Sequence, residues 1–149
     1  MFKSSRPDHS ISHLLPMTSN SNNTTYFGLT IPFLAHLGVV PEYAEGGKSR
    51  ISLVIQPEFE NSFQIAHGGV VMTLLDFAMG AAARSTVNQQ LGAMTIDMNV
   101  SFLRPSIGKI VVEGSVLKFG KTIHYCEAIV LNEAGEVTAK SSGTFMLRR

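Results

Sequence analysis

Hydrophobic and polar positions along the chain predict one strand, one long buried helix and then four more strands. Residues 50–56 alternate between apolar and polar side chains, which is the period of a half-buried strand. Residues 69–84 are apolar on most sides of a helix, which predicts a helix buried in the core. The last four runs are rich in Val, Ile, Thr and Phe, and the short turn segments between them predict an antiparallel meander. These runs are 93–103, 109–119, 122–132 and 136–147.

Two shorter segments complete the expected architecture. Residues 32–38 predict a short helix, because Pro32 suits a first helical turn and Gly38 suits the position after the last one. Residues 39–47 are expected to form a loop. The fold class is therefore α+β, with an antiparallel sheet that carries one long helix on its face.

Length and composition indicate a single domain that associates with other copies of itself. Residues 1–25 are rich in Ser, Asn and Thr and predict a mobile N-terminal tail, although they could instead pack against a neighbouring subunit. Residues 26–149 suit one domain. Charged residues make up 15% of the chain, below the usual value of about 25%. This deficit favours a homo-oligomer with surface buried between subunits.

Charge, cysteine content and hydropathy disfavour several classes of protein. The net charge is +1 and the basic residues are scattered, so no nucleic-acid partner is expected. The start of the chain lacks the apolar core of a secretory signal, and no run approaches the ~18 apolar residues of a membrane span. A cytoplasmic protein without a membrane partner is the simplest expectation. The histidines lack paired metal-ligand spacing, so no metal is expected. His124 is expected at a strand surface or an interface, and Cys126, the single cysteine, in the core.

Asp76 is the first candidate for chemistry. It lies in the middle of the apolar helix, where a carboxylate is costly unless it is paired, hydrogen-bonded or protonated. It shares one helical stripe with small or polar residues, Gly69, Thr73 and Gly80. A structural role, such as a hydrogen bond to Thr73 or a nearby loop, is one interpretation. A functional carboxylate is the other, because perturbed acids concentrate at active sites.

The sequence His67-Gly68-Gly69 at the predicted helix start is the second candidate. Its glycines could simply allow a tight turn into the helix. Alternatively, the free N–H groups of a first helical turn suit a carbonyl oxygen that becomes an oxyanion. Gly68 and Asp76 are eight residues apart, or roughly 12 Å along a helix. If both act on one substrate, the site must combine Gly68 of one chain with Asp76 of another in a two-fold dimer.

These residues resemble a known family. Asn61, the His-Gly-Gly turn, Asp76 and the run 95–105 (TIDMNVSFLRP) look like a hot-dog-fold acyl-CoA thioesterase, most similar to the phenylacetate-degradation type. The resemblance covers about residues 30–147. It implies a five- or six-stranded antiparallel sheet wrapped around one long central helix. It also implies dimers with shared active sites that commonly pair into tetramers, and an acyl-CoA substrate whose CoA takes the place of any separate cofactor.

The resemblance also implies a role for each matching residue. Gly68 would donate its N–H to the thioester carbonyl, and Asp76 would act as general base or nucleophile. Asn61 would orient the nucleophile or the carbonyl, and Thr95 the attacking water. His67 would help form the turn and could contact the thioester.

Further substrate contacts are expected around these groups. Gly69 and Thr73 lie on the same helix face as Asp76, and Arg104 and Lys121 are the preferred cations for the CoA phosphates. Phe63 and Met79 are candidates for the acyl pocket, with plain core packing as the alternative. Two rival functions stay open: a non-catalytic acyl-CoA-binding module and a hot-dog acyl-thioester dehydratase.

Overall fold

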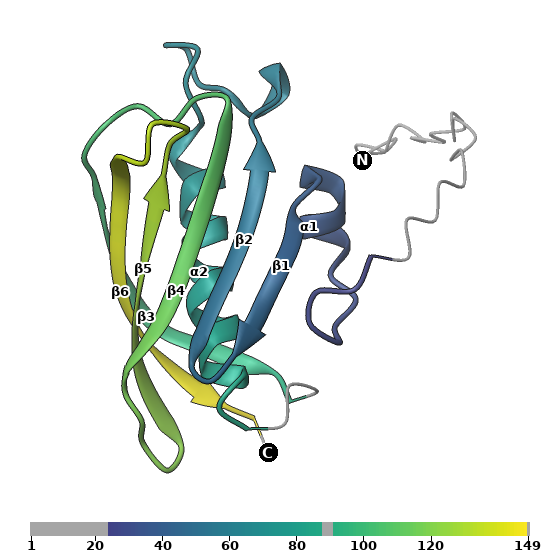
Figure 1. Cartoon of the computed structure of the whole chain (residues 1–149), viewed down its shortest axis with the longest axis vertical. Coiled ribbons are helices and arrows are strands. Elements are labelled where there is room, and N and C mark those ends of the chain that lie inside the picture. Colours follow the sequence, from purple (N-terminus) through teal and green to yellow (C-terminus); the bar gives the residue numbers. More distant parts are fainter. Residues whose placement is uncertain (1–23, 88–90, 149) are drawn as a thin grey trace, which may run out of the picture.

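In the computed structural model, which describes residues 24–87 and 91–148, six strands form one antiparallel sheet that curves around a long helix (Figure 1). This arrangement confirms the α+β hot-dog architecture. A short helix and a 3-10 turn complete the described elements. In chain order they are α1 (Pro32–Leu37), β1 (Val40–Glu45), β2 (Lys48–Val54), η1 (Pro57–Phe59), α2 (Gly68–Arg84), β3 (Ala93–Phe102), β4 (Lys109–Lys118), β5 (Ile123–Leu131) and β6 (Val137–Leu147).

The strand order is β1-β2-β4-β5-β6-β3, so the predicted meander is correct for β4, β5 and β6 and wrong for β3. β3 pairs with β6 at the edge of the sheet, because residues 103–108 cross the end of the sheet instead of forming a hairpin. This segment is hydrogen-bonded at both ends. The Leu103 N–H donates to the Thr138 carbonyl at 2.8 Å, and the Gly108 carbonyl accepts from the Ile55 N–H at 2.9 Å. The chain thereby passes from the edge strand to a position beside β2.

β1 lies within the segment that we expected to be a loop. Pro41 and two glutamates are unusual in a strand, so the sequence of β1 does not predict one. Proline is tolerated here because β1 is an edge strand, where one row of N–H groups has no partner strand. Gly46 and Gly47 connect β1 to β2 with φ of 60° and 81°, the left-handed values that a tight two-residue hairpin needs. The sheet therefore has a second edge strand, at the far side from β3.

The core lies between α2 and the concave face of the sheet. Leu74, Leu75 and Ala78 of α2 have no exposed surface, which confirms the predicted buried helix. The helix approaches β4 closely at Gly114, where a Cβ would overlap the Ala78 carbonyl oxygen. That carbonyl also accepts a hydrogen bond from Ser49 Oγ at 2.6 Å. Burial and this close contact fix the position of α2 along the sheet.

Residues that follow the predicted tail pack onto α2. The Tyr26 ring meets Phe77 edge-on at 5.8 Å, and the Phe27 ring stacks on Phe77 at 6.1 Å. Arg84, near the helix C-terminus, donates to the Phe27 carbonyl at 2.8 Å. Most of the predicted tail, residues 1–23, lies outside the described residues. None of the described helices is long and apolar enough to cross a membrane.

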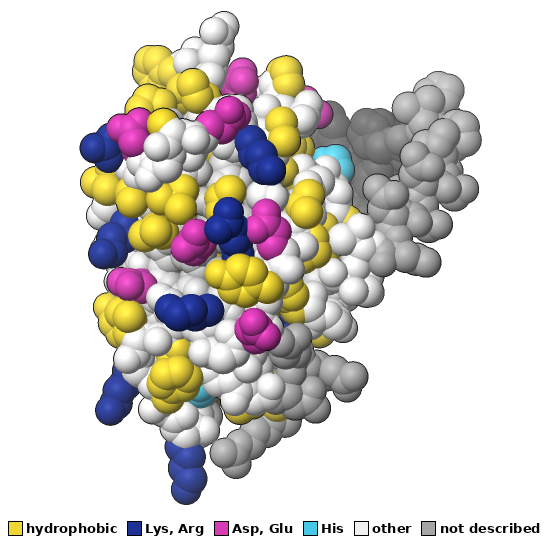
Figure 2. Space-filling model, viewed as in Figure 1, with side chains coloured by type: hydrophobic (Ala, Val, Ile, Leu, Met, Phe, Trp, Pro, Cys, Tyr) yellow, Lys and Arg dark blue, Asp and Glu magenta, His cyan; other side chains and the backbone are white. Residues whose placement is uncertain are grey.

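The face shown in Figure 2 carries basic and acidic side chains interspersed with hydrophobic ones over its described part. Among the sheet residues, Arg50 pairs with Glu42 at 2.6 Å and with Glu113 at 3.3 Å. Such half-exposed pairs contribute little to stability. Apart from Lys121, which lies in the turn between β4 and β5, the functional candidates lie on α2, on β3 and in the loops at the end of the sheet where α2 begins.

Candidate active site

The start of α2 leaves one backbone N–H without a partner. His67 caps the helix, because its Nδ1 accepts from the Gly69 N–H at 2.9 Å and its carbonyl accepts from the Val70 N–H at 2.9 Å. No acceptor for the Gly68 N–H lies among the described residues. Since this N–H sits at the positive end of the helix dipole, it can stabilise an oxygen that gains negative charge.

A pocket of about 380 Å³ opens beside Gly68. Asn61, Phe102 and Arg104 are among its lining residues. Asn61 Oδ1 accepts from the Phe63 N–H at 2.9 Å, which leaves the amide nitrogen of Asn61 as the group able to donate to a ligand. The structure therefore brings together Asn61, Gly68 and Arg104, three of the residues that the sequence analysis selected.

Asp76 and Thr95 form a second pair. Asp76 is half-buried on α2, and Thr95 Oγ1 donates to its Oδ1 at 2.5 Å. The pairing of β3 with β6 shifts register between Thr95 and Asp97, so Ile96 forms a bulge beside this contact. Bulges re-aim neighbouring side chains and are frequent next to active sites. Asp76 and Thr95 both line a second pocket, of about 140 Å³.

Within one protomer the two pockets are separate. They share no lining residue. The helix rise puts Asp76 roughly 12 Å from Gly68 along α2. A carbonyl bound at Gly68 is therefore beyond the reach of the Asp76 carboxylate of the same chain.

The other predicted contact residues have different surroundings. Thr73 Oγ1 donates to the Gly69 carbonyl at 2.9 Å, a bond within the first turns of α2. Phe63 is 80% exposed in the loop before α2. Met79 is fully buried and its Sδ accepts from Ser141 Oγ at 3.6 Å. Met79 therefore belongs to the core of the protomer, which is the alternative that the sequence left open, and it lines neither pocket.

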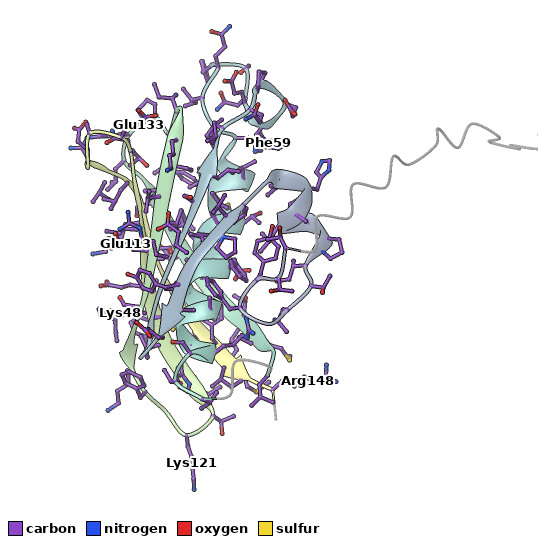
Figure 3. The ribbon with its side chains drawn as sticks, turned by 45° about the vertical axis from the view of Figure 1, so that its right-hand side comes forward. Lys48, Phe59, Glu113, Lys121, Glu133 and Arg148 are labelled. Atoms are coloured by element: carbon purple, nitrogen blue, oxygen red, sulfur yellow. The ribbon has the colours of Figure 1, made fainter. Side chains whose placement is uncertain are left out.

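The two predicted phosphate-binding cations lie at opposite ends of the protomer. Arg104 lines the pocket at Gly68, where it donates to the Val137 carbonyl at 2.8 Å and lies 3.6 Å from Glu136. Lys121 lies at the tip of the β4–β5 hairpin, far from Phe59, whose carbonyl accepts from the His67 N–H at 2.8 Å (Figure 3). A single protomer does not bring Lys121 to the start of α2.

His124 and Cys126 are buried on β5, away from both pockets. The expectation that His124 lies at a strand surface is wrong: its ring is 3% exposed, with Nε2 3.1 Å from Thr86 Oγ1 and the Phe119 ring edge-on at 6.2 Å. Burial lowers the pKa of His124. Burial raises the pKa of the Cys126 thiol to about 12, so a thiolate nucleophile is unavailable near neutral pH. No cluster of three metal-binding side chains occurs in residues 24–87 and 91–148.

Leu29 and Ile31 are site residues that the sequence analysis missed. Both line the pocket beside Asp76, although they lie 47 and 45 positions before it in the chain. Their segment follows the polar N-terminal region and has no strand or helix periodicity to mark it. The one signal in the sequence was the cluster of aromatic residues Tyr26 and Phe27, which dock the segment onto Phe77.

The fold and these pockets define a hot-dog domain with a carboxylate on its central helix and a free amide at the start of that helix. Residues 63–139 match the Thioesterase superfamily. A Halobacterium salinarum protein with a provisional esterase name is 35% identical over 112 residues, and the match covers 72% of this chain and 74% of that protein. Human acyl-coenzyme A thioesterase 13 is 31% identical over 104 residues, and the match covers 68% of this chain and 74% of the human protein.

A solved structure shows the same fold. The Escherichia coli PaaI protein, from the phenylacetic acid degradation operon, has a TM-score of 0.74 at 21% identity, with 80% of this chain and 86% of its own covered. At that identity the likeness concerns the fold alone. The sequence matches carry the assignment: this chain belongs to the Thioesterase superfamily, and acyl-CoA thioesterases are among its homologues.

Proposed function

We propose that this protein hydrolyses acyl-CoA thioesters to a free acid and CoA, at a site formed by two protomers of a homodimer. The observation that carries the proposal is the division of the chemical groups along α2. The free Gly68 N–H lies in one pocket and the Asp76–Thr95 pair in another, roughly 12 Å further along the helix. Each protomer thus holds two complementary halves of a site.

The proposed reaction uses these halves together. The Gly68 N–H of one protomer binds the thioester carbonyl oxygen, and Asp76 of the other takes a proton from a water molecule that attacks the carbonyl carbon. The tetrahedral intermediate then collapses, the C–S bond breaks, and the proton passes to the CoA sulfur. General-base help of this kind is worth roughly 10²–10⁴-fold in rate. Direct attack by the Asp76 carboxylate, through a mixed anhydride, is the alternative route with the same residues.

Thr95 and Asn61 would position the reacting groups. The Thr95 hydroxyl donates a hydrogen bond to Asp76, so the lone pairs of its oxygen are left to accept a hydrogen bond from the attacking water. Asn61 uses its amide oxygen within its own turn, which leaves its amide nitrogen to donate to the carbonyl or the thioester. His67 contributes by fixing the turn through its bond to the Gly69 N–H.

β3 is the element that we expect to join the two protomers. It is an edge strand, and Met94, Ile96 and Phe102 along it are each more than half exposed. An exposed edge strand with unpaired backbone groups readily pairs with another strand. Antiparallel pairing of two β3 strands about residue 98 would place Thr95 of one copy opposite Ser101 of the other. Asp76 and Thr95 would then approach the pocket at Gly68 of the partner.

The finer substrate assignment follows the same geometry. Arg104 lies at the rim of the pocket at Gly68, and Lys121, at the opposite end of a protomer, would approach a site only across a two-fold axis. We propose both as contacts for the CoA phosphates. The phenylacetate-degradation type of thioesterase, assembled as a dimer of dimers, is the specific family type that the motif resemblance supports.

The two rival functions fit the geometry less well. A binding-only module does not need a carboxylate with a hydroxyl partner in a pocket, yet the Asp76–Thr95 pair is present. A dehydratase would use a histidine with a carboxylate for proton transfer. The Nδ1 atom of His67 instead accepts the Gly69 N–H in the helix cap, so the neutral ring carries its proton on Nε2 and cannot accept a second proton there.

An acyl-CoA assay of Asp76→Asn tests the proposal. The purified full chain is given a panel of acyl-CoA substrates, and CoA release is followed with a thiol reagent. We expect Asp76→Asn to lose at least about 10²-fold in kcat and Thr95→Val to lose less. Glu58→Gln, which neutralises an exposed carboxylate outside both pockets, should keep wild-type activity. A folded Asp76→Asn protein with wild-type turnover would exclude the proposed role of this carboxylate.

A further inference from the structure

The pocket beside Asp76 extends away from the carboxylate between α2, β3 and the segment before α1. Asp76 and Thr95 form its polar end. Most of the other lining residues are apolar: Leu29, Ile31, Phe77, Ala81, Ala93 and Phe145. Gly92 and the buried Arg84, which donates to the Leu91 and Phe27 carbonyls, also line the pocket. Gly80, one helical turn after Asp76, completes the wall from α2.

The outer wall of this pocket is held in place by several contacts. Tyr26 and Phe27 pack their rings on Phe77, and Tyr26 Oη donates to the Val39 carbonyl at 3.1 Å. Arg84 anchors the same segment through the Phe27 carbonyl. Leu29 therefore follows a fixed stretch of chain, so the pocket has a defined size.

That size suits a compact apolar group. The pocket holds about 140 Å³, and an engineered apolar cavity of about 150 Å³ in another protein binds benzene. A group of about six carbon atoms therefore fits within the pocket, whereas a long alkyl chain would have to extend beyond it. The α2 backbone at Gly80 forms one side of the pocket. A Cβ added there would lie 3.5 Å from the Phe145 ring and 3.7 Å from Ala93 Cβ, so a larger residue would fill part of the space.

We propose that this pocket receives the acyl group of the thioester, and that Gly80 and Leu29 restrict that group to about the size of a six-carbon ring. The inference rests on the proposed function, because the reacting carbonyl must lie at Asp76 for the acyl group to enter here. The CoA portion then leaves in the opposite direction, toward the pocket at Gly68 of the other protomer. Acyl selection and CoA binding are thereby assigned to different pockets.

Two substitutions with opposite effects test this assignment. Gly80→Ala adds one methyl group at ordinary van der Waals distances, so the fold tolerates it, and it narrows the pocket. Leu29→Ala removes three carbon atoms from a half-buried side chain and widens the pocket. Both are assayed as full chains with acetyl-, hexanoyl-, benzoyl- and dodecanoyl-CoA, and thermal unfolding checks that each variant is folded.

The expected result is a change in selectivity that has opposite signs in the two variants. One methyl group in an apolar pocket changes kcat/KM by about 10–200-fold. Gly80→Ala should lower kcat/KM for hexanoyl- and benzoyl-CoA at least tenfold more than kcat/KM for acetyl-CoA, whose short acyl group serves as the internal reference. Leu29→Ala should gain on dodecanoyl-CoA relative to acetyl-CoA.

The outcomes separate this inference from the proposed function. If the wild-type protein hydrolyses acyl-CoA but both variants keep its chain-length profile, the acyl group binds elsewhere and this inference is overturned. A wild-type preference for dodecanoyl-CoA would overturn it as well. If the wild-type protein hydrolyses none of the four substrates, the proposed function itself fails. A uniform loss on all substrates in both folded variants would show a structural role and would also overturn the assignment.

Discussion

Replacing Gly68 with proline should remove one backbone N–H and leave α2 in place. Gly68 is the first residue of α2, where proline is tolerated because this N–H has no partner within the helix. The preceding residue, His67, has φ −58° and ψ 137°, close to the polyproline II conformation that a following proline favours. A Cβ at this position would lie 3.4 Å from the Phe102 ring, an ordinary contact. We therefore expect Gly68→Pro to fold.

The expected loss follows from the chemistry of the missing N–H. Removing one oxyanion donor typically lowers kcat by about 10²–10³-fold, or about 2.7–4 kcal/mol of transition-state stabilisation. Gly68→Ala is the matched control, because it adds the same Cβ and keeps the N–H. Both variants are assayed for CoA release at saturating acyl-CoA, with unfolding curves to verify folding. Equal turnover of the two variants would refute Gly68 as the donor.

The same variant tests whether the site is shared between protomers. Gly68→Pro and Asp76→Asn chains are co-expressed in equal amounts, each with its own affinity tag. Random pairing makes half of the dimers mixed, and one of the two sites in each mixed dimer combines an intact Gly68 with an intact Asp76. Roughly one quarter of wild-type activity should therefore return. If mixed dimers form, as the tags show, and activity stays at the level of the single variants, each site lies within one protomer.

Two further predictions concern stability. Gly114→Ala should lower the free energy of unfolding by about 1–3 kcal/mol or more, because its Cβ would overlap the Ala78 carbonyl and lie 2.7 Å from Ser49 Oγ. An unchanged midpoint of urea unfolding would show instead that α2 can shift along the sheet. His124 has a pKa lowered by burial, so the unfolded chain binds its proton more readily than the folded protein does. Its contribution to stability is present above a pH of about 6.5 and is lost as the pH falls below that value. Urea unfolding between pH 5 and pH 8 should therefore show a smaller loss of stability toward low pH in His124→Gln than in the wild type, and parallel curves would contradict this account.

The elements of the fold could be predicted from the sequence because each has a local signal. Hydrophobic periodicity placed α2 and the four later strands within about two residues of their observed ends, which is the usual uncertainty of such boundaries. The pairing of β3 with β6 could not be predicted in this way. It depends on the path of residues 103–108, which is fixed by hydrogen bonds to Thr138 and Ile55 far away in the sequence. β1 was missed because Pro41 and its glutamates are typical of loops as well as of edge strands.

The candidate site was partly predictable for the same reason. The His-Gly-Gly turn and Asp76 carry local signals, since glycines at a helix start and a carboxylate in an apolar helix are each unusual. The contact of Asp76 with Thr95 required tertiary structure, and a resemblance to a family supplied it. Neither the local signals nor the family resemblance indicated Leu29. Met79 was one of the candidates for the acyl pocket, although it lies in the core. Periodicity reports which face of α2 is apolar and does not report which part of that face lines a cavity.

The exposed edge strand connects the stability of the protein to its chemistry. In a single protomer, β3 presents unpaired backbone groups and side chains such as Ile96, which is 55% exposed. Natural proteins usually protect such an edge with charges, proline or a covering element. Strand pairing between two protomers would satisfy these backbone groups and would bring Thr95 toward the other copy. A substitution on β3 that blocks pairing, such as Met98→Pro, should therefore abolish dimers and hydrolysis together, whereas loss of Asp76 should abolish hydrolysis and leave dimers intact. If the β3 variant lost its dimers and kept hydrolysis, or kept its dimers and lost hydrolysis, β3 pairing would not be what assembles the site.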